Sequence, residues 1–389
     1  MSCDPLKPYN ALPDLPPAGA CETVAVLKHC ITAARSLAEL KAASSQLPNP
    51  ALLTHNLVLL EAQASSEIEN IVTTHDELFS AERHPADQLE PATKEALRYR
   101  DALWVGLDAL AAGKPLCTNV YISIMQCLRG TDAGLRSTPG TTLSNPSSGE
   151  VFYTPPEGEA LLRDRLGALD RFIHDPQIDL DPLIKIALTH YQFEAIHPFA
   201  DGNGRSGRIL CILQLLAEGL LSEPVLYLSG AILADKSTYY ERLRAVTLQA
   251  DWEGWLCYFL QAINRAAKQA VHTIAQIRQR ADELEQHIRQ HLPAKAPHHA
   301  LAELLVELPY CGIASLVERG LAKRQTAASY LQQLVDSDAG FSVRKIGREN
   351  MYVHDRLIAV LSQGARHDYK LQDTQNISVS RDQRLWPKP

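Results

Sequence analysis

The sequence predicts a mainly α-helical protein that contains one small β-hairpin and ends in a winged helix-turn-helix unit. Three observations predict this class. Apolar residues recur at helical spacing through most of the chain, one short β-prone run lies near its middle, and the last third changes to short helices followed by two strands. With 389 residues, 46% of them hydrophobic, the chain is long enough for two or three units that each bury a core.

Residues 1–112 are expected to form an N-terminal helical region. The first twenty residues are rich in proline and favour an extended segment. Apolar spacing then predicts helices, which are interrupted at Asn49-Pro50 and ended at Gly113-Lys114-Pro115. These helices are expected over Glu22–Leu47, Ala51–Ile71 and Pro91–Ala112.

Residues 113–267 are expected to form a second, mostly helical unit. Ser147-Ser148-Gly149 has turn chemistry and the β-prone run Val151–Thr154 stops at two prolines, so this stretch predicts the hairpin. Asp181-Pro182 offers an N-cap and a first-turn proline to the next helix. The run RILCILQLLAEGLL, residues 208–221, is almost wholly apolar, which is typical of a central core helix.

The last part of the chain is expected to be a helical linker over 268–297, a winged helix over 298–362 and a polar tail over 363–389. The predicted recognition helix runs from Lys323 to Val335. Basic residues of the predicted wing surround Gly347, namely Arg344, Lys345 and Arg348. Cations and polar side chains suit DNA, but winged helices also serve as protein-interaction or dimerisation modules, and both alternatives stay open.

Composition narrows the function classes. The net charge of −7 argues against nucleic-acid binding by the whole molecule. No apolar run is long enough for a membrane helix, and the first residues lack a signal-peptide core, so we expect a cytoplasmic protein with no membrane partner. The eight cysteines form no CxxC pair, which favours free thiols over disulfides or zinc ligands.

The most informative stretch is HPFADGNGRSGR, from His197 to Arg208. Glycines on both sides of Asn203, at the start of an apolar helix, leave backbone N–H groups open to phosphate oxygens. Arg205 and Arg208 are forked donors suited to a polyphosphate, and Asp201 is a hard oxygen ligand suited to Mg²⁺. His197 is able to take a proton from an attacking hydroxyl. The stretch therefore predicts nucleotide phosphate chemistry on a hydroxyl acceptor. It is not a P-loop, because the GK[ST] ending is absent.

HPFADGNGRSGR resembles the signature of the Fic (filamentation induced by cAMP) family, HPF-x-[DE]-GN-[GK]-R-x-x-R, at every fixed position. The surrounding sequence fits that family from about Pro115 to Ala267, which implies a Fic-type helical core. Members of the family mostly transfer AMP from ATP to a Ser, Thr or Tyr hydroxyl of a protein and release pyrophosphate. Gly204 goes with AMP transfer, since the phosphate-transferring Doc branch has lysine at that place.

The resemblance also implies roles for individual residues. His197 would be the catalytic base and Asp201 would hold the Mg²⁺ between the α- and β-phosphates. Arg205 would bind the β-phosphate and Arg208 the γ-phosphate. The residues that would contact ATP are Glu69, His197, Gly202, Asn203, Gly204, Arg205, Ser206, Gly207, Arg208 and Tyr240. Tyr240 is chosen over its neighbour Tyr239 for the adenine side of the pocket.

The hairpin SSGEVFYTPP resembles the flap of the family, whose exposed strand edge would pair with the backbone of the target protein. We expect it to use Gly149, Val151, Phe152, Tyr153 and Thr154. An ordinary surface hairpin is the alternative.

The run SSEIEN, Ser65 to Asn70, forms the second informative stretch. Ser65 and Glu69 are four residues apart and share one helix face. The run resembles the inhibitory motif of the family, [ST]-x-x-x-E-[GN], matched by Ser65, Glu69 and Asn70, and would lie on an inhibitory helix over about 57–70. Glu69 would then pair with Arg208 and misorient ATP.

Together these features predict an autoinhibited protein adenylyltransferase with ATP as co-substrate and Mg²⁺ as cofactor. Its targets would be proteins with Ser, Thr or Tyr hydroxyls, and could include the enzyme itself. Three alternatives stay open: removal of AMP, transfer of another group by the same site, and a nucleotide-sensing regulator that binds DNA. A homodimer is also left open.

Overall fold

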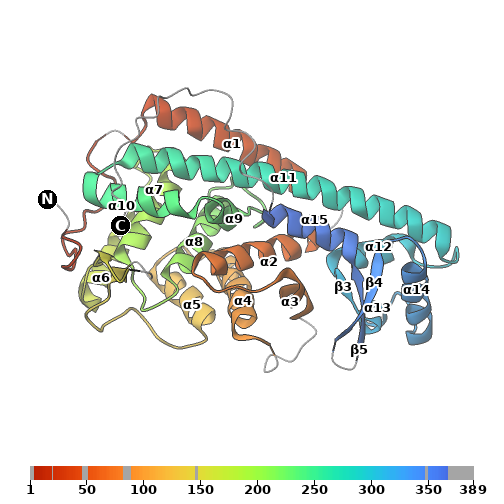
Figure 1. Ribbon diagram of the computed structural model, residues 1–389. Helices are drawn as coiled ribbons and strands as arrows, with labels where there is room; N and C mark the ends of the chain where they lie inside the picture. Colours follow the sequence, from red (N-terminus) through yellow and green to blue (C-terminus); the bar gives the residue numbers. More distant parts are fainter. Residues whose placement is uncertain are drawn as a thin grey trace, which may run out of the picture.

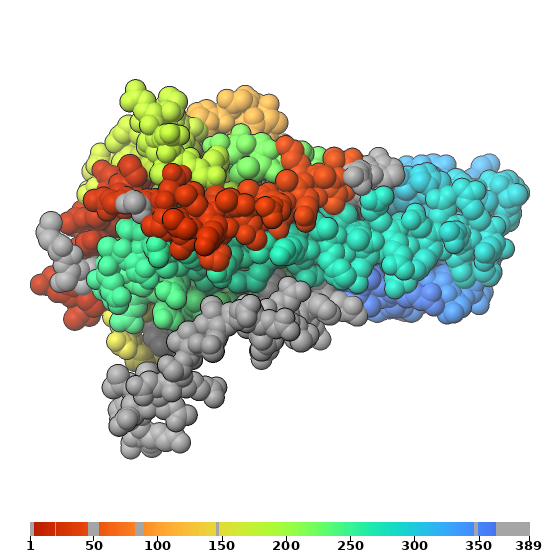
Figure 2. All heavy atoms as spheres, turned by 90° about the horizontal axis from the view of Figure 1, so that it is seen from above, coloured from red at the N-terminus to blue at the C-terminus, as the bar shows by residue number. Residues whose placement is uncertain are grey.

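The computed structural model describes residues 4–19, 21–45, 51–81, 89–144, 148–346 and 349–366, and within these ranges it is mainly helical (Figure 1). A long helix, α11 (Trp252–His291), runs along the whole molecule and forms its spine. Helix α1 (Val24–Ser45) lies against α11, as Figures 1 and 2 both show. Asp251 caps the start of α11, where its carboxylate accepts a hydrogen bond from the Gly254 amide at 3.0 Å.

The spine is amphipathic, and its apolar residues recur at helical spacing so that one face is buried along the length of the helix. Helix α11 contacts α1, α7 (Pro182–Ile196) and α9 (Leu228–Leu233), and it also contacts α12 (His298–Glu307) and α15 (Asp355–Arg366) of the C-terminal part, so it joins the two parts of the molecule. The prediction places a domain boundary between residues 267 and 268, but the helix continues through this point without a break.

The helices that carry the predicted site pack around α8 (Asn203–Ala217), which is buried over nearly its whole length, as its apolar sequence predicts. Asp181 caps α7 by accepting from the Leu183 amide at 2.8 Å, and Pro182 occupies its first turn. The other helices of this part are α2 (Ala51–Ile68), α3 (His75–Ser80), α4 (Pro91–Ala111), α5 (Thr118–Arg129), α6 (Glu159–His174), α7 (Pro182–Ile196), α9 (Leu228–Leu233) and α10 (Lys236–Gln249).

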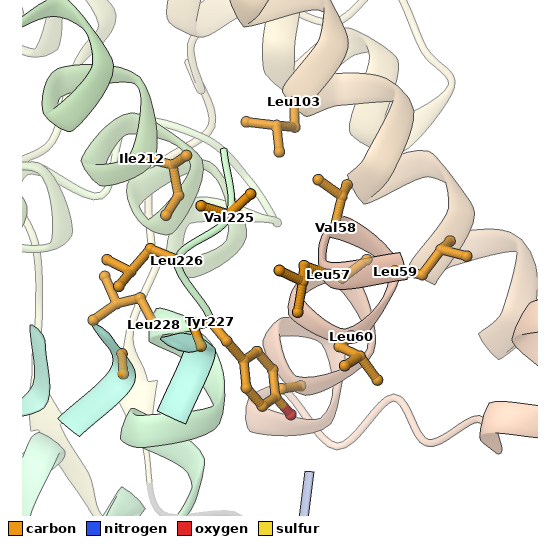
Figure 3. Close-up of a cluster of buried hydrophobic side chains, with 14 of the residues drawn as sticks. Leu57, Val58, Leu59, Leu60, Leu103, Ile212, Val225, Leu226, Tyr227 and Leu228 are labelled. Carbon is orange, nitrogen blue, oxygen red and sulfur yellow. The ribbon is translucent and has the colours of Figure 1, made fainter. Parts of the chain in front are cut away.

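Helix α2 is held in this bundle by apolar packing (Figure 3). Its Leu57 and Val58 point toward the segment Val225–Leu228 that leads into α9, and Leu103 of α4 lies close by. These side chains are at most 4% exposed. Complete burial of such a side chain stabilises a fold by about 1.5–3 kcal/mol. The predicted inhibitory helix is therefore an integral part of the core, and the predicted boundary at residue 112 does not separate it from the site.

A two-stranded antiparallel sheet forms the predicted hairpin. Strand β1 (Leu143–Ser144) pairs with β2 (Val151–Tyr153), with Leu143 opposite Tyr153. Gly149 has a φ of 70°, a left-handed conformation that favours glycine, where turn chemistry is predicted. Ser147, which also belongs to the predicted turn, lies outside the described residues.

The C-terminal unit has the predicted order of helices and strands. A three-stranded antiparallel sheet, ordered β3-β5-β4, packs with the helices, and Phe341 of β4 pairs with His354 of β5. The winged-helix interpretation stays a prediction, and the wing residues Gly347 and Arg348 are outside the described residues. Its elements are α12 (His298–Glu307), β3 (Tyr310–Cys311), α13 (Ile313–Glu318), α14 (Arg324–Asp336), β4 (Phe341–Ile346), β5 (Glu349–His354) and α15 (Asp355–Arg366).

Three smaller predictions concern the cysteines, membrane-spanning helices and the C-terminal tail. The seven cysteines of the described ranges are free thiols, as predicted, and Cys3 is outside those ranges. Among the described residues, no helix is long and apolar enough to cross a membrane. The predicted polar tail begins within α15, which runs to Arg366, and the rest of it lies outside the described residues.

Candidate active site

The turn between α7 and α8 forms the centre of the candidate site. His197 ends α7 in a left-handed conformation with a φ of 49°, and Gly202, with a φ of 82°, precedes α8. The first turn of α8 leaves N–H groups without intrahelical partners and carries the positive end of the helix dipole. The predicted cradle for an anion is therefore present as a helix N-terminus.

Asn203 holds this turn together. Its side-chain oxygen accepts from the Phe199 amide and its side-chain nitrogen donates to the Phe199 carbonyl, both at 2.8 Å. The side chain is 2% exposed. Asn203 was predicted to contact ATP, but both polar atoms of its side chain are already engaged in this contact, so only its backbone N–H suits a phosphate.

His197 has the protonation state that a general base needs. Burial, together with the nearby positive charge of Arg136, lowers the pKa of the imidazole to about 4, while the charge of Asp201 acts in the opposite direction. The ring is therefore neutral at pH 7 and able to accept a proton. The His197 carbonyl accepts a hydrogen bond from Nε of Arg136 at 2.7 Å.

Arg205 and Arg208 lie behind the turn, and each is 1% exposed. Glu69 bridges them: its Oε2 is 2.7 Å from Nε of Arg205, and its Oε1 is 3.2 Å from Nη2 of Arg208. The sequence predicts only the pair with Arg208, so the shorter contact with Arg205 is an addition. Arg205 also donates to Glu95 of α4 at 3.0 Å.

Glu69 lies directly on the first turn of α8. A Cβ atom built on Gly204 would lie 2.7 Å from Oε1 of Glu69 and 3.0 Å from Nη1 of Arg208. A larger residue at position 204 would therefore collide with this contact. The carboxylate of Glu69 therefore lies beside Gly204 in the first turn of α8, between the side chains of Arg205 and Arg208.

The other residues of the predicted inhibitory motif fix Glu69 in place. Nε of Arg208 donates to the Ser65 hydroxyl and Nη2 to the Ser65 carbonyl, both at 2.8 Å. Asn70 adopts a φ of 64° just after the end of α2, a left-handed position that asparagine tolerates at helix ends. Its side-chain oxygen accepts from Lys236 at 3.2 Å. Ser65 and Glu69 therefore contact arginines of α8, whereas Asn70 contacts α10.

A cavity of about 700 Å³ lies in front of this cluster. Its wall includes Glu69, Asn70, Glu194 and Tyr240, together with flap residues on the opposite side. Tyr240 is 42% exposed, whereas Tyr239 is buried and 2.9 Å from His190. Of the two tyrosines, the structure places the predicted one in the cavity.

The flap contributes Phe152 and Tyr153 to the same wall. Tyr153 is 7% exposed and its hydroxyl donates to the Ala195 carbonyl at 2.7 Å. Thr154 is corrected: its carbonyl accepts from the Tyr9 amide at 2.9 Å and its hydroxyl donates to the Pro5 carbonyl. The N-terminal segment therefore covers Thr154, which is not part of a free strand edge.

Asp201 lies at the mouth of the site, where its side chain is 53% exposed. Its Oδ2 is 2.5 Å from Arg129 at the end of α5. Within the described residues no group of three or more His, Cys, Asp or Glu side chains could hold a metal ion. A single hard oxygen ligand still suits a Mg²⁺ whose other ligands are phosphate oxygens and waters.

Sequence reasoning missed several charged residues around the site, of which Glu61 and Arg136 are buried. Glu61 of α2 accepts from the Ser229 amide at 2.8 Å and from the Tyr99 hydroxyl at 3.1 Å. Its spacing is a signal that was available, because Glu61, Ser65 and Glu69 recur every four residues on one helix face. Arg129, Glu95 and Arg136 come from other elements and carry no such local signal.

Three family profiles match separate parts of the chain. The Fic/DOC family N-terminal profile covers residues 27–108, the Fic/DOC family profile covers 120–215, and the C-terminal domain profile of the SoFic-like protein adenylyltransferases covers 281–357.

Among curated proteins, a Fido domain-containing protein of Dictyostelium discoideum is 34% identical over 101 residues, which is 24% of this chain and 67% of that protein. A protein named adenylyltransferase Fic, from Nematostella vectensis, is 37% identical over 100 residues. Protein adenylyltransferase fic-1 of Caenorhabditis briggsae is 33% identical over 67 residues. The chain spans 22% of the Nematostella protein and 13% of the Caenorhabditis protein, and the matches cover 25% and 17% of this chain.

Solved structures show the same fold. A Fic family protein from Desulfovibrio desulfuricans superposes with a TM-score of 0.54 at 20% identity, over 87% of this chain and 98% of that one. Residues 134–508 of Fic-1 from Caenorhabditis elegans superpose with a TM-score of 0.50 at 18% identity, over 64% of this chain and 74% of that one.

Proposed function

Because the chain belongs to the Fic/DOC family, we propose that it is a protein adenylyltransferase that moves AMP from ATP to a Ser, Thr or Tyr hydroxyl of a protein. One observation carries the proposal: a histidine that is neutral at pH 7 stands beside a helix N-terminus whose first turns hold two buried arginines. Two of the similar proteins are themselves named adenylyltransferases.

The chemistry follows from this arrangement. The acceptor hydroxyl attacks the α-phosphorus of ATP, its proton passes to His197, and the bond between the α-phosphorus and the bridging oxygen breaks, so that pyrophosphate leaves. The N–H groups of the first turn of α8 bind the α-phosphate, where negative charge accumulates. Arg205 and Arg208 bind the β- and γ-phosphates and favour the departure of pyrophosphate.

Mg²⁺ fits the site as a cofactor, with Asp201 as the residue that would hold it. The ion supplies positive charge to the phosphates when it is bound. For Mg²⁺ to bind, Arg129 would have to release the Asp201 carboxylate. Because Asp201 is half-exposed, loss of this ion pair costs little free energy.

We further propose that Glu69 inhibits the enzyme by occupying the phosphate-binding cations. Its carboxylate engages both arginines and lies beside Gly204 in the first turn of α8, so it competes with the β- and γ-phosphates for these two cations. Glu69 lines the cavity, and the two arginines lie behind it. ATP that binds in front of Glu69 would have a misplaced α-phosphate, and a misplacement of about 1 Å is enough to cost about a hundredfold in rate.

The test is labelling with α-³²P-ATP and Mg²⁺, followed by intact-mass measurement. We expect the Glu69→Gly protein to gain adenylyl groups on itself or on a protein in a lysate. We expect His197→Ala in the same background to gain none. Parallel reactions with the other nucleoside triphosphates identify the transferred group, and release of AMP from isolated labelled protein reports the reverse activity. The absence of any His197-dependent label from any nucleotide would contradict the proposal.

DNA binding by the C-terminal unit remains a separate proposal. Lys323 and Arg324 are exposed at the start of α14, which suits phosphate contacts. Arg344 is already paired with Asp76 and Asp355, so it adds less to a DNA-binding surface than its sequence position implies. A gel shift that weakens steeply with salt would support DNA binding. A homodimer, which the sequence leaves open, would be tested by sedimentation.

A further inference from the structure

Arg136, in the segment between α5 and β1, is a buried cation with an unusual set of partners. The residue is 6% exposed, and burial lowers the pKa of its guanidinium. Its side chain donates to three backbone carbonyls: Nε to His197 at 2.7 Å, and Nη2 to Pro156 and, at 3.4 Å, to Ile196. Within the described residues, its hydrogen bonds go to carbonyls and no ion pair joins it to a carboxylate.

A buried arginine without a paired acid is costly, so its position calls for a reason. The three carbonyls belong to two segments of the chain. Ile196 and His197 form the catalytic turn, and Pro156 ends the flap. The Arg136 amide adds a fourth contact, to the Pro198 carbonyl at 3.0 Å. Arg136 therefore fixes the backbone of the catalytic turn and fastens the flap to it.

The turn needs such support. His197 has a φ of 49°, a conformation that costs a non-glycine residue about 1–2 kcal/mol. If the turn relaxed, the orientation of the imidazole relative to the N-terminus of α8 would change. The forked guanidinium is able to hold two carbonyls in a fixed geometry, which a single-point donor such as lysine does less well.

Arg136 also affects the pKa of His197 through its charge. Arg136 is the largest contributor to its lowered pKa after burial, and Asp201, itself paired with Arg129, acts in the opposite direction. Glu194, one turn earlier on α7, lines the cavity. Removal of Arg136 therefore leaves a histidine that binds a proton more readily.

We propose that Arg136 is a positioning residue for AMP transfer, which holds His197 in its left-handed turn and locks the flap to that turn. The inference rests on the proposed function. Arg136 does not touch the reacting atoms in this arrangement, and acts through the carbonyls of His197 and Pro156.

The test compares Arg136→Met with Arg136→Lys, both in the Glu69→Gly background. For Arg136→Met we expect kcat to fall by about a hundredfold with the KM for ATP changed less than about threefold, because geometry and not ATP binding is lost. The pH below which activity is lost should also rise by about one unit, since a cation near His197 is gone. Arg136→Lys keeps the charge, so it should retain the original pH limit with an intermediate kcat.

The matched control is Arg165→Met. Arg165 is an arginine of α6 that also holds a backbone carbonyl, that of Asn10 at 3.0 Å, but it contacts neither the catalytic turn nor the flap strands. We expect the kcat of Arg165→Met to stay within about twofold of the parent value. The pH below which its activity is lost should shift by no more than about a few tenths of a unit.

A second readout does not depend on activity. In the NMR titration of ¹³C-labelled histidine, the signal that disappears in His197→Ala belongs to His197, one of 14 histidines. Its pKa should rise in Arg136→Met, and the amides of Val151–Tyr153 should exchange faster in both Arg136 variants. A lower kcat with an unmoved His197 titration, or unchanged exchange of the flap amides, would overturn the proposal. Lack of AMP transfer by the Glu69→Gly parent would instead count against the proposed function, and the titration would still decide the role of Arg136.

Discussion

The twelve residues from Ser65 to Asp76 make two ionic contacts of opposite character. At one end, Glu69 bridges two arginines that are each 1% exposed. At the other end, Asp76 at the start of α3 receives Arg344 at 2.6 Å and the Tyr310 hydroxyl from the C-terminal unit. The side chains of Asp76 and Arg344 are 57% and 38% exposed.

This difference in exposure separates what the two contacts are able to do. Water and salt screen the contact at Asp76, so the pair adds little to stability and its loss is easily tolerated. The contact at Glu69 has replaced the hydration of two guanidinium groups, and these cations need an anion at all times. Only the buried contact has the properties of a switch, because ATP phosphates and Glu69 are alternative anions for the same cations.

The largest expected effect comes from replacing the arginine of the buried contact by methionine, and the same replacement in the exposed contact is its control. Arg208→Met in the Glu69→Gly background should reduce AMP transfer by about 10²–10³-fold, the usual cost of losing one preorganised donor from an active site. Arg344→Met in that background should leave transfer within about twofold. Initial rates at saturating ATP measure both. Equal losses of rate in the two variants would show that the exposed contact also supports the active site. Exposure would then not separate the functions of the two contacts.

The second prediction locates the acid sensitivity of the C-terminal unit in its core. His354 is 3% exposed and stacks on Phe341 with ring centroids 4.6 Å apart, and burial lowers its pKa to about 4. Above pH 6.5 the folded and unfolded states are both neutral at this residue. Between pH 6.5 and 4 only the unfolded state binds the proton, so stability falls by roughly 3 kcal/mol over that window.

The measurement is the free energy of unfolding of β4 and β5, from amide exchange at pH 7 and pH 4.5. His354→Phe keeps the ring stack. When the pH falls from 7 to 4.5, its free energy of unfolding should decrease by roughly 2 kcal/mol less than that of the parent. Buried histidines elsewhere, such as His190, are present in both proteins, so their contributions cancel in the difference between the two free energies of unfolding. If the free energies of unfolding of the two proteins depended on pH in the same way, exposed charged groups and not His354 would cause the acid sensitivity.

The third prediction tests the switch itself. Glu69→Gly should raise AMP transfer about tenfold or more, because a hydrogen bond to a charged group is worth about 1.5–3 kcal/mol and 1.4 kcal/mol is a factor of ten. The matched control is Glu67→Gly, which weakens the same turn of α2 and removes a carboxylate that is not in the arginine cluster. A similar gain in Glu67→Gly would mean that loosening of the helix, and not release of the arginines, activates the enzyme.

The sequence predicts the elements of the site better than their partners. The α8 N-terminus with its glycines and the helix that carries Ser65 follow from local spacing and composition. Glu69 and Arg205 are 136 positions apart, and Arg136 and His197 are 61 positions apart. Local spacing has no access to such contacts, which depend on how helices far apart in the chain pack.

Two revisions of the predicted site have the same physical origin. Asn203 looks like a phosphate ligand in the sequence, but its amide closes the turn by pairing with Phe199. Thr154 looks like part of a free strand edge until the N-terminal residues Pro5 and Tyr9 cover it. In both cases a polar group that was assigned to a ligand is satisfied by a backbone group of the protein itself.

The smallest expected effect tests whether the exposed contact is as weak as its exposure suggests. Asp76→Asn keeps the shape of the side chain and removes its charge, so the unfolding free energy should fall by less than about 1 kcal/mol and the Tm by about 2 °C or less. The remaining effect should fade further at 0.5 M salt, where charges are screened over only a few ångströms, on the order of 4 Å. The double variant with Arg344→Met isolates the pair from its surroundings. A coupling above about 2 kcal/mol that resists salt would show that the contact is sheltered in solution, and the C-terminal unit would then be fastened to the chain beside Glu69 as firmly as Glu69 is to the arginines.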